Sequence, residues 1–270
     1  MRFPGEDVRA GDTVLSSGRR IRPADIALLA AIGRAEIRVH RRPRVGILAT
    51  GSEIVAPGPE PAPGQIWDSN SDAIAALVIQ AGGVPVPLGI VRDNEADIRA
   101  RLSSRSDIDL IVTSGGVSAG DLDLIKDILR QDGTIAFWQI RIKPGRPLAF
   151  GSFAGIPLLG LPGNPVAVAV TFLQFVRPAI LTMLGRADLA LPTVTARMLD
   201  PVDNSGNRRH YVRVRLIETE TGFDARLAGA QGAGILSTLA NADGLLVVPE
   251  SLAFVEPGAI LPVELLDWER

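Results

Sequence analysis

From residue 44 onward, short aliphatic runs alternate with longer segments of mixed polarity. The runs at 45–49 and 109–113 are dominated by Val, Ile and Leu, which is typical of strands buried on both faces. The mixed segments have the length, capping residues and glycine stops of helices. This alternation predicts a mostly parallel sheet with helices on both faces. The predicted strands are 45–49, 84–90, 109–113, 135–142, 148–151 and 156–161, and the predicted helices are 69–80, 95–102, 121–129 and a long one after 165.

The two ends of the chain follow other patterns. Near the start, apolar residues at helical spacing predict a helix over 23–32, and 36–39 resembles a strand. Beyond 191, strand-like runs are separated by proline and glycine at the spacing of a small barrel or sandwich. These runs are 193–199, 211–218, 222–227, 244–249 and 260–266. We therefore predict a short N-terminal α+β segment over 1–43, a three-layer α/β/α domain with a mostly parallel sheet over 44–188, and an all-β domain over 189–270.

Composition narrows the possible functions. The chain has 270 residues, of which 46% are hydrophobic, so it has enough apolar surface for a sizeable core. Its 28 basic and 30 acidic residues are interspersed, and the net charge of −2 provides no basic field for nucleic acid or an anionic membrane. The lack of cysteine excludes disulfides, thiol nucleophiles and Cys-type metal sites. Since only two histidines are present, we expect any metal to be a hard cation bound by carboxylates.

No apolar stretch is long and clean enough to predict a membrane span. The nearest candidate, 166–184, is interrupted by Gln174, Arg177 and Pro178. The first residues also lack the apolar stretch of a signal peptide. We therefore expect a cytoplasmic protein with neither a membrane nor nucleic acid among its partners.

Polar residues follow the first buried strand, at the edge where open parallel sheets bind their ligands. In the segment 50–53, Gly51 permits close approach of a ligand to the backbone, and Glu53 supplies a carboxylate. By itself this short pattern also fits an ordinary turn after a strand.

A second polar loop follows the strand predicted at 109–113. Gly115 and Gly116, with hydroxyl residues on both sides, lie between this strand and a helix, so free backbone N–H groups and the helix dipole would face one point. This arrangement favours binding of an anion. It lacks the lysine of a P-loop and the spacing of a dinucleotide fingerprint, which excludes those two phosphate motifs. A tight glycine turn would explain the glycines but not the hydroxyls and carboxylates grouped around them.

Two further turns are stiffened by proline. Lys143 and Arg146 lie three residues apart in a turn with two prolines, and a stiff cationic turn suits a phosphate or an oxyanion. The corner 161–165 places two prolines between a strand and a helix. A surface hairpin with solvated charges is an open alternative for the first turn, and simple helix initiation is one for the second.

Taken in chain order, these motifs resemble the molybdopterin molybdenumtransferase family, which is related to the C-terminal domain of gephyrin. The resemblance covers essentially the whole chain in register, and its first segment, 5–7, is similar to the one by which the family enters this part of its structure. The motifs that carry it are Thr50-Gly51-x-Glu53, Asp68-Ser69-Asn70, Arg92-Asp93, Ser114-Gly115-Gly116-Val117-Ser118-x-Gly120-x-x-Asp123, Lys143-Pro144-Gly145 and Leu161-Pro162-Gly163-Asn164-Pro165.

The resemblance implies an enzyme that inserts molybdate into adenylylated molybdopterin, with Mg²⁺-dependent release of AMP. It implies a catalytic carboxylate group of Glu53, Asp93 and Asp123. Glu53 and Asp123 would hold Mg²⁺, which offsets the repulsion between clustered carboxylates, and Asp7 would contribute a further acid. The implied substrate-binding residues are Thr50, Gly51, Asp68, Ser69, Asn70, Ser114, Gly115, Gly116, Val117, Ser118, Lys143, Arg146, Pro162, Gly163 and Asn164.

The sequence departs from the family in two respects. Arg146 stands where the family commonly has lysine, which keeps the charge but replaces a point donor by a planar fork. Family members also carry well over a hundred residues before the position of Gly5, in a lobe that helps close the active site across a dimer interface. The resemblance therefore implies a homodimer, with a separate N-terminal lobe and other enzymes of molybdenum cofactor biosynthesis as further candidate partners.

Two other functions stay open. Without a counterpart of the N-terminal lobe, the chain fits a non-catalytic molybdopterin-binding or scaffold module. A pterin adenylyltransferase built on the same three-layer fold is the second alternative. The C-terminal strands and the Lys143 turn argue against it.

Overall fold

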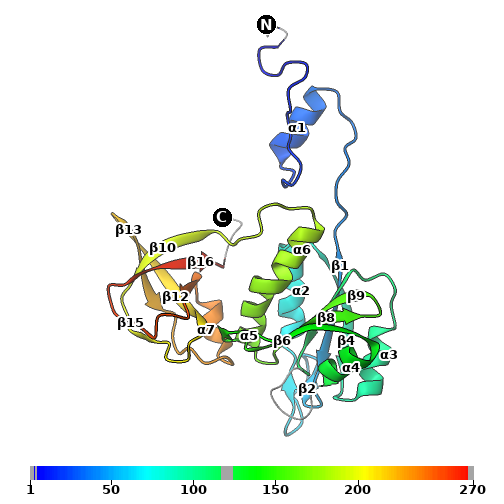
Figure 1. Cartoon of the computed structure of the whole chain (residues 1–270), viewed down its shortest axis with the longest axis vertical. Coiled ribbons are helices and arrows are strands. Elements are labelled where there is room, and N and C mark those ends of the chain that lie inside the picture. The colour runs from blue at the N-terminus through cyan, green and yellow to red at the C-terminus, as the bar shows by residue number, and fades with distance from the viewer. Residues whose placement is uncertain (1–2, 4, 117–123, 267–270) are drawn as a thin grey trace.

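The computed structural model describes residues 3, 5–116 and 124–266. Figure 1 shows three parts. An N-terminal segment, in blue, extends away from the remainder. An α/β part follows on the right, and a β-rich part, in yellow to red, lies on the left.

The α/β part is built on a six-stranded sheet with the order β4-β1-β5-β9-β8-β6. The first four strands in this order are parallel, and the last two are added antiparallel. The strands are β1 (Arg44–Thr50), β4 (Val84–Val91), β5 (Leu110–Ser114), β6 (Gly133–Gln139), β8 (Pro147–Phe153) and β9 (Ile156–Leu161).

Helices cover both faces of this sheet (Figure 1). In β5, Leu110 and Val112 belong to the core on one face, while Ile111 belongs to the core on the other. Because both faces are buried, the strand is apolar throughout its centre. This arrangement confirms the predicted three-layer fold. The helices are α2 (Asn70–Gln80), α3 (Glu95–Leu102), α4 (Leu124–Asp132), α5 (Pro165–Thr171) and α6 (Arg177–Met183).

A π-helical turn, η1 (Phe172–Val176), joins α5 to α6, so that Pro165–Met183 forms one long helix. By length and composition this helix is apolar enough to cross a membrane. However, 67% of its most apolar window is buried inside the protein. That degree of burial is typical of the core helix of a soluble protein.

The C-terminal part contains a second six-stranded sheet with the order β13-β10-β16-β14-β12-β7. Since β13 also pairs with β12, the sheet closes on itself like a barrel. Its strands are β7 (Ile142–Lys143), β10 (Thr193–Met198), β12 (Arg209–Thr219), β13 (Gly222–Leu227), β14 (Gly244–Val248) and β16 (Ile260–Leu265). Strand β7 comes from the α/β part of the chain and pairs with β12. Two short strands of the same part, β11 (Val202–Asp203) and β15 (Phe254–Val255), form a separate antiparallel pair.

Several local predictions were wrong. Residues 36–39 form no strand; they are exposed and extended, and no strand among the described residues pairs with them. The strand predicted over 135–142 is divided into β6 and β7, which belong to different sheets. Two further elements had no counterpart in the predictions: a short helix in the C-terminal part, α7 (Leu236–Ala240), and a small strand pair after β1, β2 (Ile54–Val55) and β3 (Ile66–Trp67). In the N-terminal segment the predicted helix is present as α1 (Pro23–Ala31).

Candidate functional site

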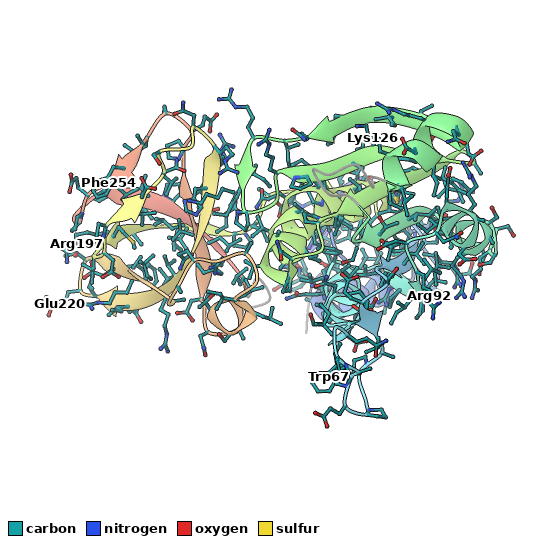
Figure 2. All side chains as sticks on the ribbon, turned by 90° about the horizontal axis from the view of Figure 1, so that it is seen from below. Trp67, Arg92, Lys126, Arg197, Glu220 and Phe254 are labelled. Atoms are coloured by element: carbon teal, nitrogen blue, oxygen red, sulfur yellow. The ribbon has the colours of Figure 1, made fainter. Side chains whose placement is uncertain are left out.

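The predicted motifs meet at one edge of the central sheet. Strands β1, β4, β5 and β9 are parallel, so the loops that follow them leave at the same edge. Strand β8 runs the opposite way, with Ala149 opposite Gly160, so the turn before Pro147 lies at this edge too. Figure 2 shows this edge from below, with Arg92 and Trp67 on segments that leave it.

The glycine loop packs directly against the end of β1. Gly115 and Gly116 have φ angles of 87° and 66°, which glycine adopts without strain. A Cβ at Gly115 would overlap the carbonyl oxygen of Thr50, and one at Gly116 would lie 2.8 Å from Thr50 Oγ1. Thr50 Oγ1 is itself buried and has no hydrogen-bond partner within the described chain. The buried hydroxyl of Thr50 therefore lies next to a backbone segment, Gly115 and Gly116, that carries no side chains.

The side chain of Asn70, at the start of α2, bonds to the loops that follow β5 and β9. Its Nδ2 donates to Ser114 Oγ and to the carbonyl oxygen of Gly163, both at 2.8 Å. Its Oδ1 is buried and finds no donor among the residues described. Ser114 is buried, so the side-chain amide of Asn70 lies partly beneath the surface at this edge of the sheet.

Asp68 and Ser69 lie at the start of α2. Asp68 Oδ1 accepts hydrogen bonds from the backbone N–H groups of Asn70 (2.9 Å) and Ser71 (3.0 Å) at the start of α2. Asp68 is buried, and these bonds satisfy helix N–H groups that would otherwise lack partners. Ser69 is exposed and makes no side-chain capping bond. Their assignment to substrate binding remains a prediction.

Two carboxylates lie on adjacent loops of the same edge. The backbone N–H of Ser52 donates to Asp93 Oδ2 at 3.3 Å, and the backbone N–H of Asp93 donates to Ser52 Oγ at 3.4 Å. Glu53 is exposed beside them. In the described ranges, no three His, Asp or Glu side chains come close enough to hold a metal ion. Asp123, Val117 and Ser118 lie outside the described residues, so the predicted carboxylate group stays a prediction.

The corner after β9 contacts both the glycine loop and the C-terminal part. The backbone N–H of Gly115 donates to the carbonyl oxygen of Leu161 at 3.2 Å. Pro162 is buried beneath this corner, whereas Gly163 and Asn164 are exposed. The backbone N–H of Val166 donates to the carbonyl oxygen of Ala233 at 3.1 Å. The segment around residue 233 therefore brings the C-terminal part to the sheet edge.

The cationic turn lies where the two sheets join. Lys143 is half-buried, pairs with His210 of β12, and precedes the exposed Arg146 by three residues. A Cβ at Gly145 would lie 2.6 Å from Thr171 Cγ2, so the turn packs tightly on α5. Burial, and then the charges of Lys143 and Arg213, lower the pKa of His210 to about 4. His210 is therefore neutral at pH 7.

Arg213 is a buried cation that the sequence analysis missed. It is 0% exposed on β12, and its Nη2 donates to the carbonyl oxygens of Ala230 (3.0 Å) and Gly232 (3.2 Å). Its Nε and Nη1 have no partner in the part of the chain that is described. Burial lowers the pKa of Arg213, and within the described residues its side chain bonds only to carbonyl oxygens. A buried, uncompensated guanidinium is costly unless an anion binds to it.

Comparison with known families agrees with this geometry. Residues 46–182 match a family described as a probable molybdopterin-binding domain. The chain belongs to the molybdopterin-binding domain family. Residues 195–266 match the MoeA C-terminal region (domain IV).

Named relatives of this molybdopterin-binding domain protein cover nearly all of the chain. It is 35% identical to a molybdopterin molybdenumtransferase of Haemophilus influenzae, covering 96% of this chain and 65% of that protein. It is 37% identical to molybdopterin molybdenumtransferase 2 of Mycobacterium tuberculosis, covering 97% of this chain and 66% of that protein. These relatives confirm the resemblance that the motifs predict. The chain spans about two thirds of the relatives' length.

Solved structures give the same result. A molybdopterin biosynthesis MoeA protein of Pyrococcus horikoshii superposes with a TM-score of 0.82 at 31% identity, over 96% of this chain and 63% of that one. A molybdenum cofactor biosynthesis protein of Pyrococcus furiosus superposes with a TM-score of 0.73 at 32% identity, over 97% of this chain and 82% of that one.

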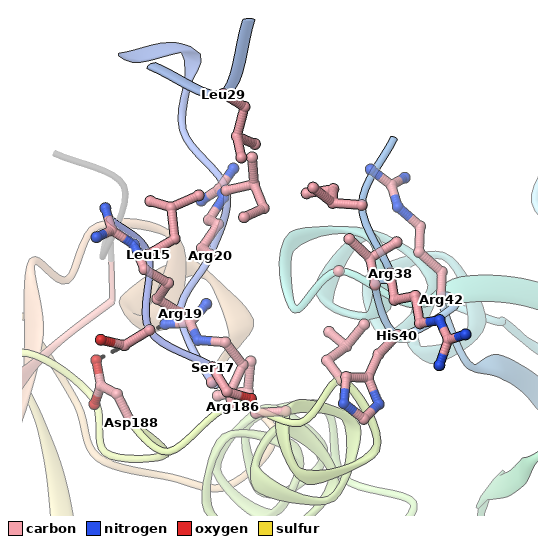
Figure 3. A pocket seen from close by; sticks show the side chains of 18 of the residues that line it. Leu15, Ser17, Arg19, Arg20, Leu29, Arg38, His40, Arg42, Arg186 and Asp188 are labelled. Atoms are coloured by element: carbon pink, nitrogen blue, oxygen red, sulfur yellow. Dashed lines mark ion pairs between the residues drawn. The ribbon is translucent and has the colours of Figure 1, made fainter. Parts of the chain in front are cut away.

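A large cavity of about 1110 Å³ lies away from these motifs, between the N-terminal segment and the C-terminal ends of α2 and α6 (Figure 3). Because α2 runs antiparallel to the strands, its C-terminal end lies at the amino edge of the sheet. Arg38, Arg42 and Arg186 line the cavity, where their charges complement the partial negative ends of the helices. Asp7 belongs to the N-terminal segment, and that segment extends away from the carboxyl edge of the sheet (Figure 1). The structure therefore does not bring Asp7 to the other predicted site residues within one chain.

Proposed function

We propose that this chain carries the molybdopterin- and oxyanion-binding part of a molybdopterin molybdenumtransferase, which inserts molybdate into adenylylated molybdopterin and releases AMP. The observation that carries the proposal is that the glycine loop and the amide of Asn70, which bonds to two other loops, meet at one sheet edge. The loop held by the buried Arg213 contacts the corner after β9 at the same edge. The names of the relatives supply the class of reaction, transfer of molybdenum to molybdopterin. The adenylylated substrate and the release of AMP are what the resemblance of the motifs implies.

The pterin would lie on the glycine loop beside Asn70. Thr50 Oγ1 and Asn70 Oδ1 are buried acceptors that lack donors among the described atoms. Buried polar atoms are normally hydrogen-bonded, and the N–H groups of a pterin ring would complete both. The missing side chains at Gly115 and Gly116 leave the backbone open to the ring or its phosphate.

The oxyanion, molybdate or the phosphate of the substrate, would lie near Lys143 and Arg213. Both side chains contribute to the electrostatic field that acts on His210. The loop whose carbonyl oxygens accept from Arg213 also reaches Asn164, which lies about 4.0 Å from the Cβ position of Gly234. Arg213 and the corner after β9, which bonds to the glycine loop, are therefore joined by one short path of contacts.

Glu53 and Asp93 fit a magnesium ion that takes its remaining ligands from substrate phosphate and water. Mg²⁺ prefers oxygen ligands and is commonly bound by one or two carboxylates plus phosphates. Both carboxylates are exposed on loops at the carboxyl edge. When bound, the ion would offset negative charge on the leaving phosphate. Asp123 remains a proposed ligand and catalytic acid.

Further proposals concern the assembly. The proposed domains are 1–43, 44–188 and 189–270, and the proposed location is the cytoplasm. The proposed assembly is a homodimer in which Asp7 reaches the site of the other copy. A separately encoded N-terminal lobe and other cofactor biosynthesis enzymes are the additional proposed partners. The distance of the N-terminal segment from the carboxyl edge supports a contribution across two chains.

The test is incubation of the chain with adenylylated molybdopterin, Mg²⁺ and molybdate while AMP is measured. We expect AMP release that requires both Mg²⁺ and molybdate. Binding of the pterin without AMP release would favour the non-catalytic module, and activity only after addition of an N-terminal lobe would show a divided enzyme. Failure to bind the pterin in calorimetry would contradict the site itself.

A further inference from the structure

The long helix Pro165–Met183 is interrupted by polar residues in its middle. Pro178 has no N–H, so the usual hydrogen bond to the carbonyl oxygen four residues earlier cannot form. Instead, the backbone N–H of Arg177 donates to the carbonyl oxygen of Phe172, five residues earlier, which closes the π-turn η1. Such turns are often found at functional sites because they change the direction of the side chains within them.

Gln174 lies inside this π-turn and binds two strands of the C-terminal sheet. Its Nε2 donates to Glu264 Oε2 of β16 at 2.5 Å. Its Oε1 accepts from the hydroxyl of Tyr211 of β12 at 3.1 Å. The surrounding interface is apolar, and includes Leu173 and Leu245. The amide of Gln174 thus makes directional hydrogen bonds within an apolar interface. Apolar contacts alone would not fix the position of the C-terminal sheet along the helix.

Arg177 binds the connection between the two parts. It is 6% exposed, and its Nη1 and Nη2 donate to the carbonyl oxygens of Leu189 (2.7 Å) and Ala190 (3.4 Å). These residues lie in the segment that leads from α6 to β10. Two neighbouring polar residues of one helix therefore hold both the C-terminal sheet and the segment that connects to it.

The position of β12 determines where the buried cation lies. Tyr211 and Arg213 share one face of β12, about 7 Å apart along the strand. Arg213 in turn holds the carbonyl oxygens of Ala230 and Gly232, next to the corner at Asn164. A shift of β12 along the helix would move Arg213 and this loop together.

We propose that Gln174 and Arg177 are positioning residues, which fix the C-terminal sheet in one orientation and thereby hold Arg213 and its loop beside the corner at Asn164. The inference rests on the proposed function for the identity of the bound oxyanion. Apolar burial stabilises the interface in many registers, whereas hydrogen bonds of fixed geometry select one of them. The polar pair therefore contributes alignment beyond stability.

A first experiment measures alignment without any ligand. Because the chain has no cysteine, Ala100→Cys and Glu220→Cys would place a pair of spin labels on the two parts at unique sites. We expect a narrow distance distribution in the parent and a broad one in Gln174→Leu. Thr182→Val, on the same helix, removes an exposed hydroxyl that bonds only within the helix, and should leave the distribution narrow. An equally narrow distribution in Gln174→Leu would overturn the proposal.

A second experiment separates alignment from stability. The triple variant Gln174→Leu, Tyr211→Phe, Glu264→Leu removes all three polar groups, so that none remains buried without a partner. We expect a thermal midpoint close to that of the parent and molybdate affinity, measured by calorimetry, about tenfold weaker. Parent-like affinity in a variant with a broad distance distribution would overturn the positioning of Arg213. A parent that binds no oxyanion would contradict the proposed function, and the distance distributions would still decide the role of Gln174.

Discussion

The two edges of the central sheet differ in how their charged and polar side chains are paired. At the amino edge, Arg41 pairs with Asp109, while Arg44 and Arg105 both pair with Asp107. These arginines lower the pKa of both aspartates through hydrogen bonds. The charges of these two aspartates are therefore offset within the protein.

At the carboxyl edge, buried polar groups are left incomplete. Thr50 Oγ1 and Asn70 Oδ1 at this edge, and two nitrogens of Arg213 on the nearby β12, have no partner among the atoms described. A buried polar group without a partner reduces stability, so such groups persist mainly where a ligand completes them. The unpaired atoms of Thr50 and Asn70 therefore support the carboxyl edge as the candidate site, whereas the ion pairs of Asp107 and Asp109 are complete without a ligand.

The largest expected effect comes from removal of the buried cation. Arg213→Met should weaken molybdate binding by about 2–5 kcal/mol, because a desolvated charge interaction is lost. Without ligand, unfolding should be little affected, since the substitution also removes an uncompensated buried charge. Calorimetric titration and thermal unfolding of the variant test both points. Unchanged molybdate affinity would place the oxyanion elsewhere.

A smaller effect is expected at the amide that joins three loops. Asn70→Ala should lower the free energy of unfolding by about 1 kcal/mol and weaken pterin binding about tenfold. Asn94→Ala is the matched control, because Asn94 caps α3 by accepting from the backbone N–H of Asp97 at 3.1 Å. It should reduce stability similarly, by about 1 kcal/mol, and leave pterin affinity unchanged. Equal affinities for the two variants would argue against a ligand role for Asn70.

Two glycines with similar backbone angles separate conformational strain from contact. Gly116→Ala and Gly155→Ala both place a Cβ at positive φ, at a cost of about 1–2 kcal/mol. The Cβ at Gly155 meets open space, whereas that at Gly116 lies 2.8 Å from Thr50 Oγ1. Only Gly116→Ala should therefore reduce pterin binding. Loss of binding in both variants would indicate a general effect of unfolding.

The smallest effect is expected at the amino edge. The hydrogen bond from Arg41 holds the pKa of Asp109 below its usual range. Its contribution to stability is present above the unfolded pKa of about 3.9 and is lost as the pH falls through the lower folded pKa. Asp109→Asn should therefore reduce the free energy of unfolding at pH 7 by less than about 1 kcal/mol and flatten its acid dependence. Urea denaturation between pH 7 and pH 2 tests this, and any change in pterin affinity would contradict the separation of the two edges.

Much of the central fold could be predicted because it depends on local sequence. The predicted helix 95–102 matches α3, since Asn94 caps its start and acidic and basic residues follow the helix dipole. The convergence of the loops after β1, β5 and β9 follows from parallel strand order alone.

The elements that the sequence did not predict depend on distant partners. Arg213 lies between two valines of a strand, and only the approach of residues 230–232 and the burial of β12 show its importance. The strand-like pattern at 36–39 lacks a neighbour that would pair with it in the described chain. Likewise, Gln174 appears in sequence only as an interruption of an apolar helix, because both its partners lie on later strands.

The pairing of β7 with β12 also sets an order of events during synthesis. The four parallel strands and the loops after them are complete once β9 has formed, so the glycine loop and its contact with Thr50 need nothing from the C-terminal sheet. Lys143 reaches its position opposite His210 only when β12 has been translated. A nascent chain that stops before β12 would therefore have the proposed pterin surface but not the proposed cationic one, and oxyanion binding would follow the synthesis of β12.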